Sequence, residues 1–161
     1  MEPITPLQAV FNRVYTHAVY VLKGRRAAFP NGGSCSLRAV QPGGLVLACF
    51  VGACISDDVY GPQLDHCGVV TAENENHEAL KAVRASGFET PPDVLDFLDR
   101  AQRLHDSGRM VNHADSGDFV PVGRTYLALT PGRRLYLWKR TLTRYAKRNG
   151  LIVPAAPVAQ P

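Results

Sequence analysis

The stretch LACFVGACISDDVY, from Leu47 to Tyr60, places two of the four cysteines of the chain in a run of small and apolar residues. Cys49 and Cys54 are five residues apart, and an acidic pair and a tyrosine follow them. The small residues around Gly52 predict a place where the chain leaves a strand and two backbone segments approach closely. We interpret both thiols first as packing residues in a tight turn, because buried cysteine behaves as a small hydrophobic side chain.

The residues just before this turn predict a β-hairpin. CSLRAV (35–40) and LVLACF (45–50) are strand-like, and QPGG (41–44) between them is a turn sequence. After the second strand, ACISDDVYGP (53–62) predicts a short helix or turn that stops at its Gly-Pro pair.

Helical patterns account for most of the rest. The predicted helices cover residues 5–24, 72–87, 90–108 and 133–150. The first begins with Thr5 as N-cap and Pro6 at the first helical position, and Thr90 is predicted to cap the third. Apolar spacing of three and four residues gives the first helix one buried face. That face is predicted to contain Leu7, Val10, Val14, His17 and Val21.

These elements predict an α+β fold, a small antiparallel hairpin packed with four to five helices in a single domain over residues 1–151. The segment 108–130 is rich in Gly, Asp and Asn, with the β-like pieces DFVPV and TYLAL, and is predicted to be a loop or hairpin insertion. Residues 152–161 are predicted to form a flexible tail.

Composition narrows the class of protein. The chain has 161 residues, of which 45% are hydrophobic and 20% charged, enough for one hydrophobic core. Its longest apolar run, LVLACFVGACI, is far shorter than the roughly 18 residues that a membrane span needs. The N-terminus lacks the charged-then-apolar layout of a signal peptide. We therefore expect a cytoplasmic protein with reduced thiols and no membrane partner, and the oligomeric state is left open.

Charge is distributed unevenly along the chain, whose net charge is +4. Residues 57–99 contain ten acidic and two basic residues, whereas residues 124–148 contain eight basic residues and no acid. The two segments could neutralise each other inside the fold. Alternatively, the last helix could offer a basic face to nucleic acid or to an acidic protein. The predicted partner-binding residues are Arg133, Arg134, Arg140, Arg144, Lys147, Arg148, Arg25 and Arg26.

Several spaced residues resemble a family of small accessory proteins encoded by bacteriophages and prophages. The resemblance covers roughly residues 7–107 and the closing helix. It rests on Leu7, Val10, Phe11, Val14 and His17, on Cys35 and Arg38, on Cys49, Val51, Gly52, Ile55, Asp57 and Tyr60, on Ala101, His105 and Asp106, and on Gly150-Leu151. The chain departs from the family at Cys54, where an aliphatic residue is usual, and in the long 108–130 segment. The resemblance implies a biological context, not a mechanism.

Two weaker alternatives would make the protein an enzyme or a metalloprotein. Two histidines and two thiols could bind zinc if the fold brought them together. The residues of that set are His17, Cys35, Cys49 and His105. The ligands are scattered, without a CxxC or HxxxH pair, so core packing is the favoured interpretation and no cofactor is expected. A thiol mechanism at Cys67 in LDHCGVV lacks a histidine in a recognisable context.

The sequence thus predicts a non-enzymatic phage or prophage accessory protein that binds and modulates a host macromolecule. A host protein is the favoured partner. The alternative is a nucleic-acid-binding regulator that uses the basic C-terminal helix, and a zinc- or thiol-dependent enzyme is third.

Overall fold

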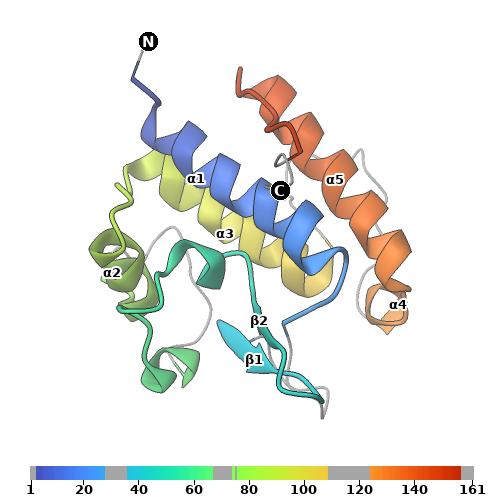
Figure 1. Ribbon diagram of the computed structural model, residues 1–161. Coiled ribbons are helices and arrows are strands. Elements are labelled where there is room, and N and C mark those ends of the chain that lie inside the picture. The colour runs from blue at the N-terminus through green and yellow to red at the C-terminus, as the bar shows by residue number, and fades with distance from the viewer. Residues whose placement is uncertain (1–2, 28–35, 67–73, 75, 109–123, 157–161) are drawn as a thin grey trace, which may run out of the picture.

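The computed structural model describes residues 3–27, 36–66, 74, 76–108 and 124–156. In chain order its elements are α1 (Pro6–Thr16), η1 (His17–Leu22), β1 (Arg38–Val40), β2 (Val46–Ala48), η2 (Gly52–Cys54), η3 (Pro62–His66), α2 (Glu78–Ala85), α3 (Pro92–Ser107), α4 (Arg124–Leu127) and α5 (Pro131–Arg148). Figure 1 shows the three long helices α1, α3 and α5 grouped together, with the hairpin near one end of the group and α2 at its side. The α+β fold predicted from the sequence is confirmed.

The first helix begins as predicted and ends in an unusual way. Thr5 Oγ1 accepts a 3.2 Å hydrogen bond from the backbone N–H of Gln8, and Pro6 is the first helical residue. From His17 the chain continues as the π-helix η1, which ends at Lys23 and Gly24, both with positive φ. The wider turn changes the helical phase. For that reason the predicted burial of Val21 is wrong, since its side chain is 49% exposed.

The hairpin lies where the sequence placed it, although its strands are shorter. β1 pairs antiparallel with β2, with Ala39 opposite Leu47. These two side chains are buried in the core. The next pair, Val40 and Val46, is exposed on the other face. This alternation is that of a ribbon with one buried face.

The middle helices differ from prediction at their N-terminal ends. α2 begins at Glu78, later than predicted, because His77 Nδ1 accepts a hydrogen bond from the N–H of Ala79 and acts as the cap. The predicted capping role of Thr90 is wrong. Pro91 holds the N-cap position of α3 without a side-chain bond, and Thr90 Oγ1 accepts from Arg84 Nε. Gly108 ends α3 with φ of 76°, as predicted.

The described part of the segment before the last helix begins with one short helix. TYLAL was predicted to be β-like, yet Arg124–Leu127 form α4. DFVPV and the other residues between 109 and 123 lie outside the described residues. α5 begins at a cap on Thr130 and ends at Gly150, where the N–H of Leu151 bonds the carbonyl of Ala146 at 2.9 Å. This bond is that of a Schellman cap.

The contacts with α1 continue past the predicted start of the tail at residue 152. Gln8 Nε2 donates to the carbonyl of Ile152, and the N–H of Ile152 donates back to Gln8 Oε1, both at 2.8 Å. Val153 is partly buried against the core. Residues 157–161 lie outside the described residues.

One core joins the three long helices to the hairpin. Its largest fully buried side chains include Trp138, Tyr15, Phe11, Phe50 and Phe97. Phe50 lies edge-on to Trp138, with ring centroids 4.9 Å apart, and so connects the residue after β2 to α5. Within the described ranges, every helix is too short or too polar to cross a lipid bilayer.

Candidate functional site

A row of exposed residues runs along α5 on the side opposite its buried side chains. Trp138, Leu142 and Ala146 are buried in the core. Residues on the opposite side follow one another at spacings of three and four, so they form one line on the helix surface. This line, which we call the outer stripe, consists of Arg133, Tyr136, Arg140, Arg144 and Lys147. Arg144 is half-buried, and the other four are exposed.

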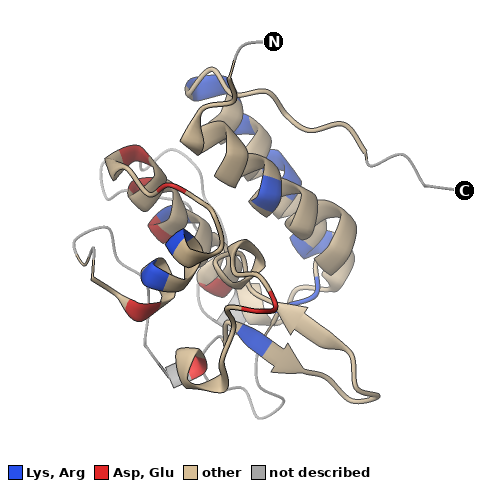
Figure 2. Cartoon of the chain, turned by 60° about the vertical axis from the view of Figure 1, so that its left-hand side comes forward, with Lys and Arg blue, Asp and Glu red and all other residues tan. Residues whose placement is uncertain are grey.

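Four acidic residues of segment 57–99 form ion pairs with basic residues that lie outside α5. The ion pairs are Asp57 with Arg38 at 2.8 Å, Glu78 with Lys81 at 2.6 Å, Asp96 with Arg100 at 2.7 Å, and Asp99 with Arg103 at 2.8 Å. Among the described residues, the exposed stripe cations Arg133, Arg140 and Lys147 form no ion pair. Figure 2 shows the blue bands of α5 along one side of the molecule and the red bands on other elements. The acidic segment therefore does not neutralise these three cations through ion pairs.

Other basic residues predicted to bind a partner are used within the fold. Arg134 Nε donates to the carbonyl of Gly24 at 2.8 Å, which ties α5 to the end of η1. Arg25 donates to the carbonyls of Val21 and Leu22 at the same end. Cations are favourable there because the last carbonyls of a helix carry partial negative charge. Both guanidinium groups therefore have a structural task, although Arg25 stays exposed.

Of the remaining two predicted residues, Arg26 contacts other parts of the fold and Arg148 lies at the end of α5. Arg26 is half-buried, and its guanidinium lies 5.9 Å from the centre of the Tyr126 ring. Arg148 is exposed in the last turn of α5. The geometry thus narrows the predicted surface to the outer stripe, with Arg148 at its C-terminal end.

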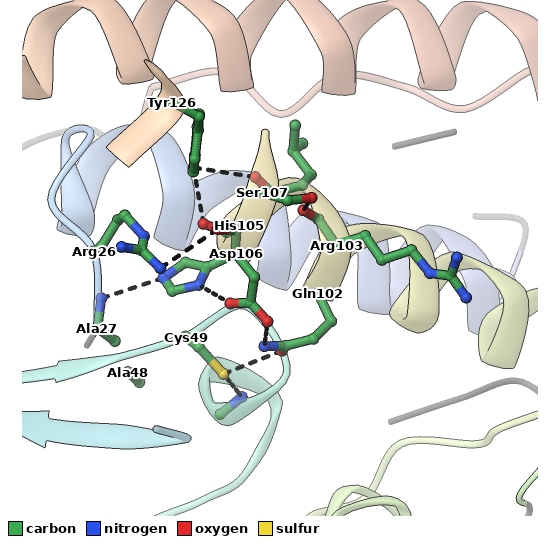
Figure 3. Close-up of polar contacts among 12 residues, drawn as sticks. Arg26, Ala27, Ala48, Cys49, Gln102, Arg103, His105, Asp106, Ser107 and Tyr126 are labelled. Atoms are coloured by element: carbon green, nitrogen blue, oxygen red, sulfur yellow. Dashed lines mark hydrogen bonds and ion pairs between the residues drawn. The ribbon is translucent and has the colours of Figure 1, made fainter. Parts of the chain in front are cut away.

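A second cluster of polar residues is buried around His105 at the end of α3 (Figure 3). His105 is fully buried, and its Nε2 accepts a 3.2 Å hydrogen bond from the N–H of Ala27. Because a backbone N–H can only donate, Nε2 carries no proton, and Nδ1 donates to Asp106 Oδ1 at 2.8 Å. Burial lowers the pKa of His105, although the Asp106 carboxylate opposes this, so the ring is neutral.

Tyr126, which the sequence did not single out, connects this cluster to α5. Its hydroxyl accepts from Trp138 Nε1 at 3.0 Å and lies 2.8 Å from the carbonyl of His105, to which it donates. It is fully buried, and burial raises its pKa to about 12. The contact fixes α4 and α5 against the end of α3. No sequence pattern around Tyr126 predicts that its hydroxyl is buried and hydrogen-bonded.

The residues of the weaker zinc alternative are engaged in hydrogen bonds where they are described. Cys49 Sγ donates to Gln102 Oε1 at 3.4 Å and accepts from the N–H of Gly52. His17 Nε2 lies 2.7 Å from the carbonyl of Ala48 and donates to it, while burial lowers the pKa of this ring. Cys35 lies outside the described residues. Among the residues that are described, no three potential ligands cluster around a metal position.

The two cysteines among the described residues, Cys49 and Cys54, are both buried. Burial raises the pKa of Cys54 to about 12, so its thiol stays protonated and is a poor nucleophile. Cys67, the residue to which the thiol mechanism was assigned, lies outside the described residues. Cys54 is therefore a packing residue, as predicted from the small residues around it.

A third cluster holds the hairpin against the turn that follows it. The Arg38 guanidinium pairs with Asp57, donates to the carbonyl of Ile55 at 2.9 Å and lies 4.2 Å from the centre of the Tyr60 ring. Asp65 Oδ1 accepts from the N–H of Arg38 at 3.0 Å, and its other oxygen accepts from the Tyr60 hydroxyl. Asp65 was not predicted to have this role. These polar groups have partners inside the fold, which favours a structural role.

Comparisons with protein-family models, with curated proteins and with solved structures find no match to this chain.

Proposed function

We propose that the protein is a non-enzymatic binding protein that holds an acidic macromolecule against the outer stripe of α5. The observation that carries this proposal is the line of exposed cations on a helix without a single acidic residue. Solvent-exposed like charges repel one another, and an opposite charge that approaches them is attracted over about a Debye length. The stripe is thus an electrostatic binding surface suited to a polyanion.

The scaffold beneath the stripe supports a binding role. α5 is held at its N-terminal end by the bond from Arg134 to Gly24, in its middle by Trp138, and at its C-terminal end by the Gln8–Ile152 pair. Binding groups on a helix that is fixed in this way lose little conformational freedom when a partner docks. The stripe therefore presents its charges in a preorganised row.

Three of the described residues that could perform chemistry are used inside the fold. His105, Cys49 and Cys54 are buried and contribute to packing or hydrogen bonding. An active site needs such groups in a place that substrate can reach. This arrangement favours binding over catalysis.

The resemblance to phage and prophage accessory proteins supplies the proposed context. On that basis the acidic macromolecule belongs to the host cell, and binding to it in the host cytoplasm modulates its activity. An acidic host protein and nucleic acid both carry the negative charge that such a partner needs.

Affinity capture from host lysate tests the proposal with two double variants. Arg133→Glu/Arg140→Glu reverses two charges of the stripe, and Lys139→Glu/Lys81→Glu reverses two exposed charges outside it. All four side chains are exposed, and the one ion pair affected, between Lys81 and Glu78, is a surface pair that contributes little to stability, so both variants are expected to fold with melting temperatures close to that of the wild type. The stripe variant is expected to lose the captured partner, and the control is expected to keep it. Equal capture by both variants contradicts the proposal, and capture repeated after nuclease treatment assigns the partner class.

A further inference from the structure

We propose, resting on the proposed function, that the outer stripe binds single-stranded nucleic acid, with the phosphates along its cations and a base stacked on Tyr136. Single-stranded nucleic acid is one kind of acidic macromolecule and so falls within the proposed function. Two independent features of the stripe support this choice, namely the row of charges and the aromatic ring within it.

The charges of the stripe form a track rather than a patch. Fourteen positions separate Arg133 from Lys147 along α5, which is roughly 20 Å at the α-helical rise. Arg140 and Arg144 lie between them. A nucleic acid strand carries one charge per nucleotide along a line and matches such a track over several phosphates. Three of the four cations are arginines, whose planar guanidinium binds phosphate oxygens in pairs.

The exposed ring of Tyr136 favours nucleic acid over an acidic protein, because an acidic protein can bind to the cations without an aromatic ring. Tyr136 is 65% exposed, although the other aromatic residues of α5, Trp138 and Tyr145, are buried or half-buried in the core. Arg133 lies one turn before it and Arg140 one turn after it, so phosphates on both cations would place a base over the ring. Base–aromatic stacking is sequence-tolerant and needs unpaired bases. This requirement favours a single strand over a duplex.

The two features predict effects that can be separated in one titration. The probe is a fluorescein-labelled oligothymidine, measured by anisotropy over a series of salt concentrations. Arg140→Glu is expected to reduce the slope of log affinity against log salt by about 0.7, the loss of one phosphate contact on a single strand. Lys139→Glu has the same change in net charge at the neighbouring position and is expected to leave the slope nearly unchanged, because Lys139 lies off the stripe.

Substitution of the ring is expected to lower affinity without changing the salt slope. Tyr136→Leu is expected to weaken binding on the order of ten-fold, and Tyr136→Phe, which keeps the ring, is expected to bind like the wild type. The side chain at this position is exposed, and the melting temperature of each variant checks that the fold is retained.

The outcomes distinguish this inference from the function on which it rests. Equal binding of a duplex of the same sequence, or equal affinity of Tyr136→Leu and Tyr136→Phe, overturns the single-strand proposal. Binding of polyglutamate but not of oligothymidine, lost in Arg140→Glu, also overturns it while leaving the acidic-partner function intact. Absence of binding to any polyanion overturns both.

Discussion

The α-carbon of Gly52 lies so close to the carbonyl of Leu37 that a β-carbon on Gly52 would stand 2.1 Å from the Leu37 oxygen. The first turn of η2 therefore packs directly on the residue that precedes β1. The N–H of Cys49 also donates to that carbonyl at 3.0 Å, so the approach is part of the hairpin itself. The prediction that small residues after Cys49 allow backbones to approach is confirmed at this contact.

Gly52→Ala is expected to destabilise the fold by about 3 kcal/mol or more, because the obstructing atom is backbone and cannot rotate away. Gly132→Ala is the matched control, since nothing lies within 4 Å of the position that its new methyl group would occupy on α5. That change is expected to be neutral or to stabilise by less than about 1 kcal/mol. Urea unfolding of the two variants measures the difference, and a Gly52→Ala protein as stable as wild type contradicts the packing described for the turn.

Tyr126→Phe is expected to cost about 1–3 kcal/mol, because it removes the acceptor of the buried Trp138 N–H. Tyr136→Phe removes the same hydroxyl from an exposed ring and is expected to leave stability unchanged. Thermal unfolding of both proteins makes the comparison. Equal melting temperatures of the two variants would contradict the stabilising role of the Tyr126 hydroxyl between α3 and α5.

Stability is expected to fall as the pH drops below about 6.5, the ordinary pKa of histidine. Burial lowers the pKa of both His17 and His105 in the folded protein, and nearby cations lower them further. A group whose pKa is lower when folded binds its proton more readily when unfolded, so protonation favours unfolding. The stabilising contribution is therefore complete above pH 6.5, the unfolded pKa, and is lost below it.

His17→Gln isolates the contribution of one ring to this pH dependence. The glutamine amide can still donate to the Ala48 carbonyl, but it does not titrate. Between about pH 7 and pH 5, on either side of the ordinary histidine pKa, the variant is expected to lose less stability than the wild type in urea unfolding. Identical pH profiles would show that His17 binds its proton equally well in both states.

Cys49→Ser is expected to destabilise the protein by about 1–3 kcal/mol, because it replaces a buried thiol with a more polar hydroxyl. Cys49 also serves as a hydrogen-bonding residue between Gln102 and Gly52, so metal loss plays no part in the expected effect. Elemental analysis accompanies the unfolding measurement. Stoichiometric zinc in the purified wild-type protein, lost in the variant, would restore the zinc alternative.

Local signals predicted most elements of this fold. QPGG between strand-like runs predicted the hairpin, and Thr5 with Pro6 predicted the start of α1. The failures arose where tertiary contacts override local preference. TYLAL has β-forming residues, but the buried hydroxyl of Tyr126 is bonded to carbonyls of α3, and the first three residues of the piece belong to the helix α4. Val21 was misplaced because the change to a π-helix leaves no clear pattern in sequence.

The basic face of the last helix could be predicted from sequence, but its separation from the basic residues that serve the fold could not. Sequence spacing does predict that Arg133, Arg140 and Lys147 share a face away from Trp138. It does not reveal that Arg134 bonds the Gly24 carbonyl, because that contact joins residues 110 positions apart. The division of the basic residues into structural and exposed groups therefore required the packing of η1 against α5.

The reciprocal pair between Gln8 and Ile152 has a consequence for how the chain folds during synthesis. The two residues are 144 positions apart, and the Tyr145 ring of α5 packs against the Phe11 ring of α1, with ring centroids 6.5 Å apart. On the ribosome, α1 emerges before α5, so the side of Phe11 that packs against Tyr145 stays uncovered until α5 has been made, although α3 can already cover the neighbouring side through Phe97. Contacts of such long range also slow folding, because the ends must meet before they stabilise anything. The nascent protein is therefore expected to depend on chaperones that shield α1 until α5 leaves the exit tunnel.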